Sequence, residues 1–205
     1  MRKPARIVLT VFLVLLVALV GTALVFYSML RHQPALYRPP EGISAAERES
    51  AFQVFEGIRK RAEEQYYDRG AFAATATTEQ LNAVIARYES SPEMRGTFQI
   101  PAELHNLQVV IQPGRAVVMA LMPTDAGSVV VSAYVTIVSD GEPHLKVGDV
   151  YVGSLAVPRE RAQRLIEKIE RQRFVFPTAD GNRLRITTIT LDDGLVTVTG
   201  VRERP

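Results

Sequence analysis

The runs AVVMALM (residues 116–122), SVVVSAYVTIV (128–138) and HLKVGDVYV (144–152) decide the fold of this 205-residue chain. Each run is rich in β-branched residues and is flanked by turn-forming residues, which predicts β-strands. Together with the run at 107–112 they predict an antiparallel meander. A meander with one face in water alternates apolar and polar side chains, but the two central runs are apolar on both faces. Both faces of these strands therefore need cover.

Two interpretations of this double apolarity are open. If helices cover both faces, the side chains form an ordinary core. If a face stays uncovered, it is a groove for an apolar ligand or a contact site for a partner. The candidate groove residues lie on the central strands and on the helices that would cover them: Leu81, Val117, Met119, Leu121, Val129, Val131, Val135, Ile137, Leu165 and Ile169.

Three amphipathic helices are predicted as covers. Ser44 and Glu47 form a capping box that begins the first helix, and Gly70 ends it. The second begins at Thr77 or Thr78, and the third follows Pro158 over about 159–173. Two last strands, at 184–191 and 195–201, are predicted as a closing edge hairpin with one solvated side. The expected fold class is α+β, with a curved antiparallel sheet packed against two or three helices.

The N-terminus predicts a membrane anchor. Residues 7–30 carry no charge and follow Arg2, Lys3 and Arg6, and about 20 apolar residues span a bilayer core. The charge bias places the first residues in the cytoplasm. A cleaved signal peptide is the alternative, although its apolar region usually has only about 7–15 residues. The expected single-pass, signal-anchored cell-membrane protein has a cytoplasmic cap and transmembrane helix at 1–31, a linker at 32–43 and an extracytoplasmic α+β domain at 44–205.

Composition and motifs exclude several classes of function. All 22 acidic residues lie at or beyond Glu41, so the net positive charge of the chain comes from its N-terminus. Nucleic-acid binding is therefore not indicated. The chain has no Cys, which excludes disulfides and thiolate chemistry. No nucleotide-binding, nucleophile-elbow or zinc-protease motif is present. We therefore predict no catalytic residues, metal or cofactor. Asp149 lies in an apolar run and is a candidate perturbed carboxylate, unless it faces solvent or a bulge at Gly148 displaces it.

Two motifs carry a resemblance. TTEQLNA (residues 77–83) and LKVGDVYVGSLAVP (145–158) resemble the YpmS-like family of bacterial single-span membrane proteins, and the order of elements is similar to that of LmeA-like extracytoplasmic lipid-binding domains. The resemblance implies that the doubly apolar strands form the wall of a lipid groove. It also implies structural roles for Asn82, Gly153 and Pro158, with the Asn82 amide tying its helix to neighbouring backbone.

Two functional hypotheses follow, and both are non-catalytic. In the first, the domain holds a lipid or another apolar envelope molecule between its sheet and helices. In the second, it is a scaffold that acts through protein–protein contacts, with envelope proteins or further copies of itself as partners. The charged face of the third helix, including Glu160, Arg161 and Arg164, would suit such contacts.

Overall fold

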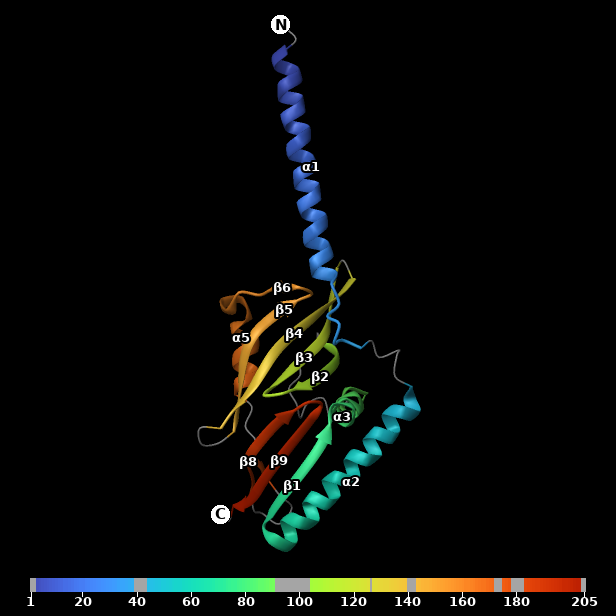
Figure 1. Cartoon of the computed structure of the whole chain (residues 1–205), viewed down its shortest axis with the longest axis vertical. Coiled ribbons are helices and arrows are strands. Elements are labelled where there is room, and N and C mark those ends of the chain that lie inside the picture. Colours follow the sequence, from blue (N-terminus) through green and yellow to red (C-terminus); the bar gives the residue numbers. More distant parts are fainter. Residues whose placement is uncertain are drawn as a thin grey trace.

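The computed structural model describes residues 3–38, 44–90, 104–125, 127–139, 143–171, 175–177 and 183–203. The protein is α+β and has two antiparallel sheets (Figure 1). The five-stranded sheet has the order β2-β3-β4-β5-β6, with β2 at His105–Gln112, β3 at Arg115–Thr124, β4 at Gly127–Val138, β5 at His144–Val152 and β6 at Leu155–Ala156. The four-stranded sheet has the order β1-β9-β8-β7, with β1 at Ala71–Thr77, β7 at Val175–Pro177, β8 at Arg183–Asp192 and β9 at Leu195–Glu203.

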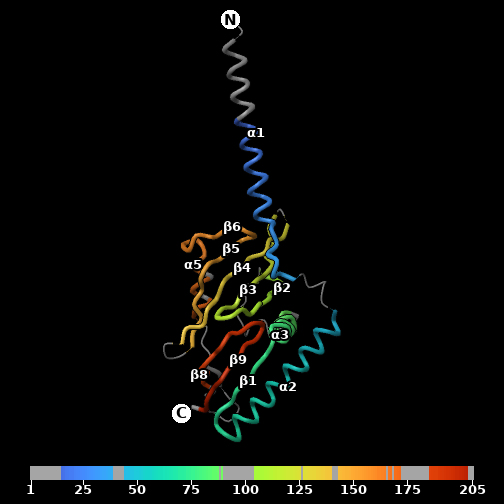
Figure 2. The backbone as a smooth tube through the Cα atoms, viewed as in Figure 1, coloured from blue at the N-terminus to red at the C-terminus, as the bar shows by residue number. Residues whose placement is uncertain are grey.

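Two helices lie beside the edge strands β1 and β2, and one lies on a face of the five-stranded sheet. α1 (Lys3–Arg31) projects away from the sheets, so that the N-terminus and the C-terminus lie at opposite ends of the molecule (Figures 1 and 2). α2 (Ala45–Arg69) packs against β1 and α3 (Thr78–Ser90), and α3 in turn packs beside β2. α5 (Arg159–Glu170) packs on the five-stranded sheet at β5.

The local sequence signals of the helices are confirmed. Ser44 and Glu47 form the predicted capping box of α2, and Gly70 ends this helix in the left-handed conformation at φ 69°. At the start of α3, Thr77 and Gln80 bond each other reciprocally, through N···O distances of 2.9 and 3.3 Å. Each of these bonds joins residues only three or four positions apart, which is why the sequence alone predicts these helix ends.

The meander is confirmed as β2–β5, and β5 contains the bulge considered at Gly148. Val135 pairs with Val147 and Ala133 pairs with Val150, so β5 has one residue more than β4 in this interval. Gly148 and Asp149 are exposed within the bulge. Asp149 therefore faces solvent and does not enter the core.

The prediction of one curved sheet with a closing edge hairpin is wrong. β8 and β9 lie inside a second sheet, where β9 pairs along its length with β1, from Ala71↔Val201 to Thr77↔Leu195. The segment 71–77 was not predicted as a strand, because AFAATAT contains no apolar β-branched residue and Ala has a weak strand preference. Its pairing with a partner distant in sequence makes it a strand.

The prediction of a transmembrane, signal-anchor helix at 7–30 is also corrected. Among the residues that the structure describes, no helix combines the length and the apolar character needed to cross a membrane.

Both faces of the central strands belong to packed clusters. On one face, β4 and β5 pack against Ala162, Ile166 and Ile169 of α5. On the opposite face, Val117, Met119 and Val130 pack with Tyr37, which comes from the segment after α1. A third cluster joins Ile111 and Ala116 of the five-stranded sheet to β8 and β9 through Leu191 and its neighbours. The third cluster therefore joins the two sheets.

Candidate ligand-binding groove beside the edge strand

The structure distributes the predicted groove residues over three clusters. Val131, Val135 and Ile169 belong to the cluster under α5. Val117, Met119 and Leu121 lie on the opposite face with Tyr37, and Leu81 and Ile137 join the cluster between the sheets. Val129 is 8% exposed and pairs with Met122, which packs under α5. The Leu165 side chain lies outside the described residues. The structure therefore does not bring these residues together along one wall.

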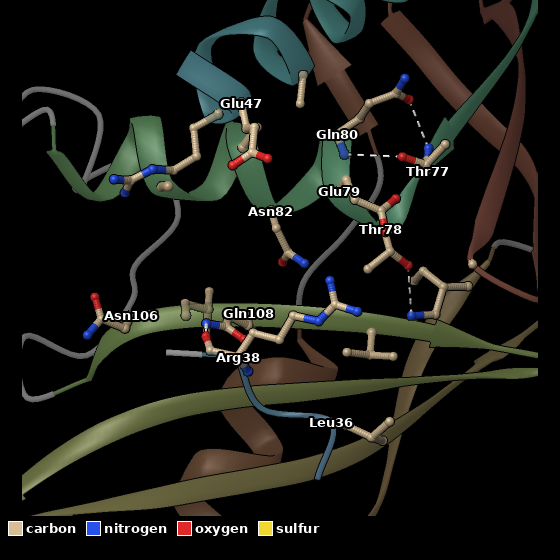
Figure 3. Close-up of a pocket in the computed structure, with 18 of the residues that line it drawn as sticks. Leu36, Arg38, Glu47, Thr77, Thr78, Glu79, Gln80, Asn82, Asn106 and Gln108 are labelled. Carbon is tan, nitrogen blue, oxygen red and sulfur yellow. Dashed lines mark hydrogen bonds between the residues drawn. The ribbon is translucent and has the colours of Figure 1, made fainter. Parts of the chain in front are cut away.

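A groove is present elsewhere, along the edge strand β2. It has a volume of about 1010 Å³ and lies between α3, β2, the first turns of α2 and residues 35–38 (Figure 3). This volume is at the upper end of the range of about 300–1,000 Å³ that small-molecule sites occupy. Its apolar lining comes from all four elements: Ala35, Leu36, Ala51, Ala83, Ala86, Leu107, Val110 and Ile111.

The wall formed by α3 is fixed to β2 by side chains that replace a neighbouring strand. The Asn82 amide donates to the Val109 carbonyl at 2.9 Å and accepts from the Val109 N–H at 2.7 Å. The hydroxyl of Thr78 accepts from the Ile111 N–H at 3.2 Å, and the Glu89 carboxylate accepts from the Leu107 N–H at 2.9 Å. Alternate residues of a strand direct their backbone groups to the same edge. One face of α3 therefore satisfies the open edge of the sheet.

The opposite wall is the short segment between α1 and α2. Gln108 holds this segment by the same two-point bond: its side-chain oxygen accepts from the Arg38 N–H at 3.1 Å, and its amide donates to the Arg38 carbonyl. Tyr37, only 6% exposed, anchors the segment on the sheet face. In Figure 3 the Arg38 side chain extends along β2 beneath Asn82. Residues 35–38 are therefore a fixed wall of the groove.

The groove-lining residue Glu47 has a pKa below its ordinary value. The hydroxyl and the backbone N–H of Ser44 both donate to its carboxylate, at 2.8 and 2.9 Å, and these bonds lower the pKa of Glu47. They favour the ionised form, so the capping box is strongest when the Glu47 carboxylate is ionised. This carboxylate is therefore already hydrogen-bonded to Ser44 at the N-terminus of α2.

Acid is expected to weaken the N-terminus of α2. Since the pKa of Glu47 is lower in the folded chain than the ordinary value of 4.5, its contribution is complete above that value. The contribution is lost as pH falls through the lower folded-state pKa. Thermal melting followed by circular dichroism at pH 7 and pH 3 would measure this loss. Glu47→Gln should melt with a smaller pH dependence than the wild type, and an unchanged dependence would contradict the assignment.

Five polar side chains of the groove are already engaged by the protein. Asn82, Thr78, Glu89, Gln108 and Glu47 each bond a backbone group of the walls. A buried polar group costs free energy only when it loses its partner. An apolar chain can therefore enter the groove without leaving these groups unpaired.

The resemblance implied a structural role for Asn82, and none of the predicted groove residues whose side chains the structure describes lines this groove. Leu36, Arg38 and Gln108 gave no signal, because residues 35–38 and 108 meet only through the fold. Asn106, which also lines the groove, has φ 51°, a backbone conformation that Asn tolerates better than most residues. Within the described ranges, no group of three or more His, Cys, Asp or Glu side chains could hold a metal ion.

The fold and the groove define an α+β protein with two joined antiparallel sheets and a partly apolar cleft at a helix-covered sheet edge. Comparison of the chain with family models, curated proteins and solved structures found no match. The resemblance to YpmS-like and LmeA-like proteins therefore stays a prediction.

Proposed function

We propose that this protein is a non-catalytic binding domain that accommodates a lipid or another apolar or amphipathic molecule in the groove beside β2. The observation that carries the proposal is a groove of about 1010 Å³ whose walls are held to β2 by the side chains of Asn82, Thr78 and Gln108. The proposed ligand is of the class predicted from the sequence, a lipid or another apolar molecule. The proposed site is the groove beside β2 and not the space between the sheet and the helices.

The lining supports an amphipathic ligand better than a purely apolar one. The apolar side chains come from different walls, with Ala35 and Leu36 in the segment 35–38 and Ala83 and Ala86 in α3. Charged side chains also line the groove, among them Arg38 and Arg48, and Arg38 is exposed. A ligand with an acyl-like chain and a polar end would match both kinds of surface.

Blocking the groove should weaken binding. In Ala86→Phe a large ring occupies the wall at α3, and we expect the affinity of the full chain for dodecanoate to fall about tenfold or more, which corresponds to about 1.4 kcal/mol. Equilibrium dialysis below the micelle concentration of dodecanoate measures this. Ala71→Phe adds the same ring at an exposed position of β1 and should leave the affinity unchanged.

Equal weakening by both variants, or none by Ala86→Phe, would show that dodecanoate binds outside the groove. Absence of binding to the wild-type chain would refute the proposed function. The Phe variants also control for amphiphile that adsorbs to α1, since neither of them changes this helix.

One observation favours the alternative scaffold function. Leu15, Leu19 and Leu24 of α1 are 63%, 69% and 64% exposed. Apolar side chains exposed at this level along one element mark a surface that contacts something outside the chain. The scaffold hypothesis assigns this surface to protein contacts, including a second copy. A wild-type chain that binds no dodecanoate and self-associates in sedimentation experiments would support this alternative.

A further inference from the structure

Residues 32–38 connect the groove to the base of α1, and both of their ends are fixed. At the α1 end, the Met29 carbonyl accepts from the backbone N–H of Ser154 at 2.9 Å and from its hydroxyl at 3.1 Å. Helix C-terminal carbonyls lack partners within the helix. The turn between β5 and β6 supplies these partners and thereby holds the end of α1.

Gly153 makes this close approach possible. It has φ +60°, and a Cβ at this position would lie 2.3 Å from the carbonyl oxygens of both Met29 and Leu30. These atoms are backbone, so they cannot move aside as the tip of a flexible side chain can. The last turn of α1 therefore fits only against a residue without a side chain.

At the other end, the segment is part of the groove. Tyr37 is buried against the sheet, Gln108 pairs with both backbone groups of Arg38, and Leu36 lines the groove. A segment of this length spans at most about 25 Å when fully extended. Only a few residues of chain therefore separate the base of α1 from the groove wall.

We propose that docking of α1 on the Gly153–Ser154 turn and occupancy of the groove are energetically coupled through residues 32–38. This inference rests on the proposed function. A ligand that contacts residues 35–38 stabilises the wall in its docked position, and the docked wall completes the ligand site. Coupling of this kind is reciprocal, so undocking α1 weakens ligand binding by the same factor by which the ligand strengthens docking.

The first arm of the test compares two glycine variants of the full chain. Gly153→Ala introduces the clash with α1, whereas Gly114→Ala introduces a similar left-handed backbone strain at φ +73° with nothing within 4 Å of the new Cβ. We expect Gly153→Ala to lower the dodecanoate affinity about fivefold or more, and Gly114→Ala to leave it near the wild-type value. Ser154→Ala removes only the hydroxyl bond to Met29 and should give a smaller loss in the same direction, which keeps the test decisive if Gly153→Ala does not fold.

The second arm measures the reciprocal effect by NMR-detected hydrogen exchange. Saturating dodecanoate should slow exchange of the Ser154 amide, which bonds Met29, in the wild-type chain but not in Ala86→Phe. If dodecanoate binds the wild-type groove and the affinities of Gly153→Ala and Ser154→Ala are unchanged, the coupling is refuted while the proposed function stands. If dodecanoate does not bind the wild-type groove, both fail.

Discussion

Replacement of Met119 by Ala is expected to lower the free energy of unfolding by about 2–5 kcal/mol. The Met119 side chain is 0% exposed and packs with Tyr37, Val117 and Val130 on the sheet face opposite α5. Truncation removes its apolar contacts and leaves a cavity, because the β-sheet cannot collapse around the missing atoms. Urea denaturation followed by circular dichroism measures the change.

This variant also decides between the two interpretations of the doubly apolar strands. Met119→Leu nearly conserves the side-chain volume and should cost less than about 1.5 kcal/mol. If Met119 lined an open ligand groove, truncation would create no closed cavity. A loss below about 1 kcal/mol for Met119→Ala would therefore contradict the closed core on this face.

Replacement of Asn82 by Ala is expected to cost about 2 kcal/mol. Asn82 donates to and accepts from the backbone of Val109, and both bonds are partly buried. Each buried backbone group that loses its partner costs about 1–3 kcal/mol, and partial access of water places the cost for this pair at the lower end. The same urea titration measures the effect.

Two variants test whether the loss arises from the two-point bond. Asn82→Asp retains an acceptor for the Val109 N–H but cannot donate to the carbonyl when it is ionised, so it should be intermediate in stability. Gln163→Ala removes an exposed amide that bonds Glu167 within α5, and should change stability by no more than about 0.5 kcal/mol. An Asn82→Ala variant as stable as Gln163→Ala would show that α3 does not depend on this bond.

The candidate site was less predictable from sequence than the fold. The two amide side chains that build the groove bond backbone groups 27 and 70 residues away, from Asn82 to Val109 and from Gln108 to Arg38. Neither separation produces a periodic pattern, and an isolated Gln or Asn is usually a surface residue. The resemblance implied a structural role for Asn82, whereas Gln108 gave no signal.

The sequence by itself determined the elements whose signals are local. The capping box at Ser44 and Glu47, the left-handed stop at Gly70 and the β-branched runs of β3–β5 each depend on neighbours within a few residues. Only the tertiary structure decided how these elements associate. Ala71–Thr77 became a strand by pairing with β9, and the closing hairpin entered a second sheet because β1 offered it a free edge.

The tertiary structure also decided what covers the second face of the central strands. Their double apolarity required cover, but the cover on the face opposite α5 includes Tyr37, an aromatic residue in a short segment without periodicity. The free energy of burying an apolar face depends on area and not on which element supplies the cover. The sequence could therefore predict that this face is either covered by the chain or used for binding. Only the folded chain shows that Tyr37 covers it and that the groove lies beside β2.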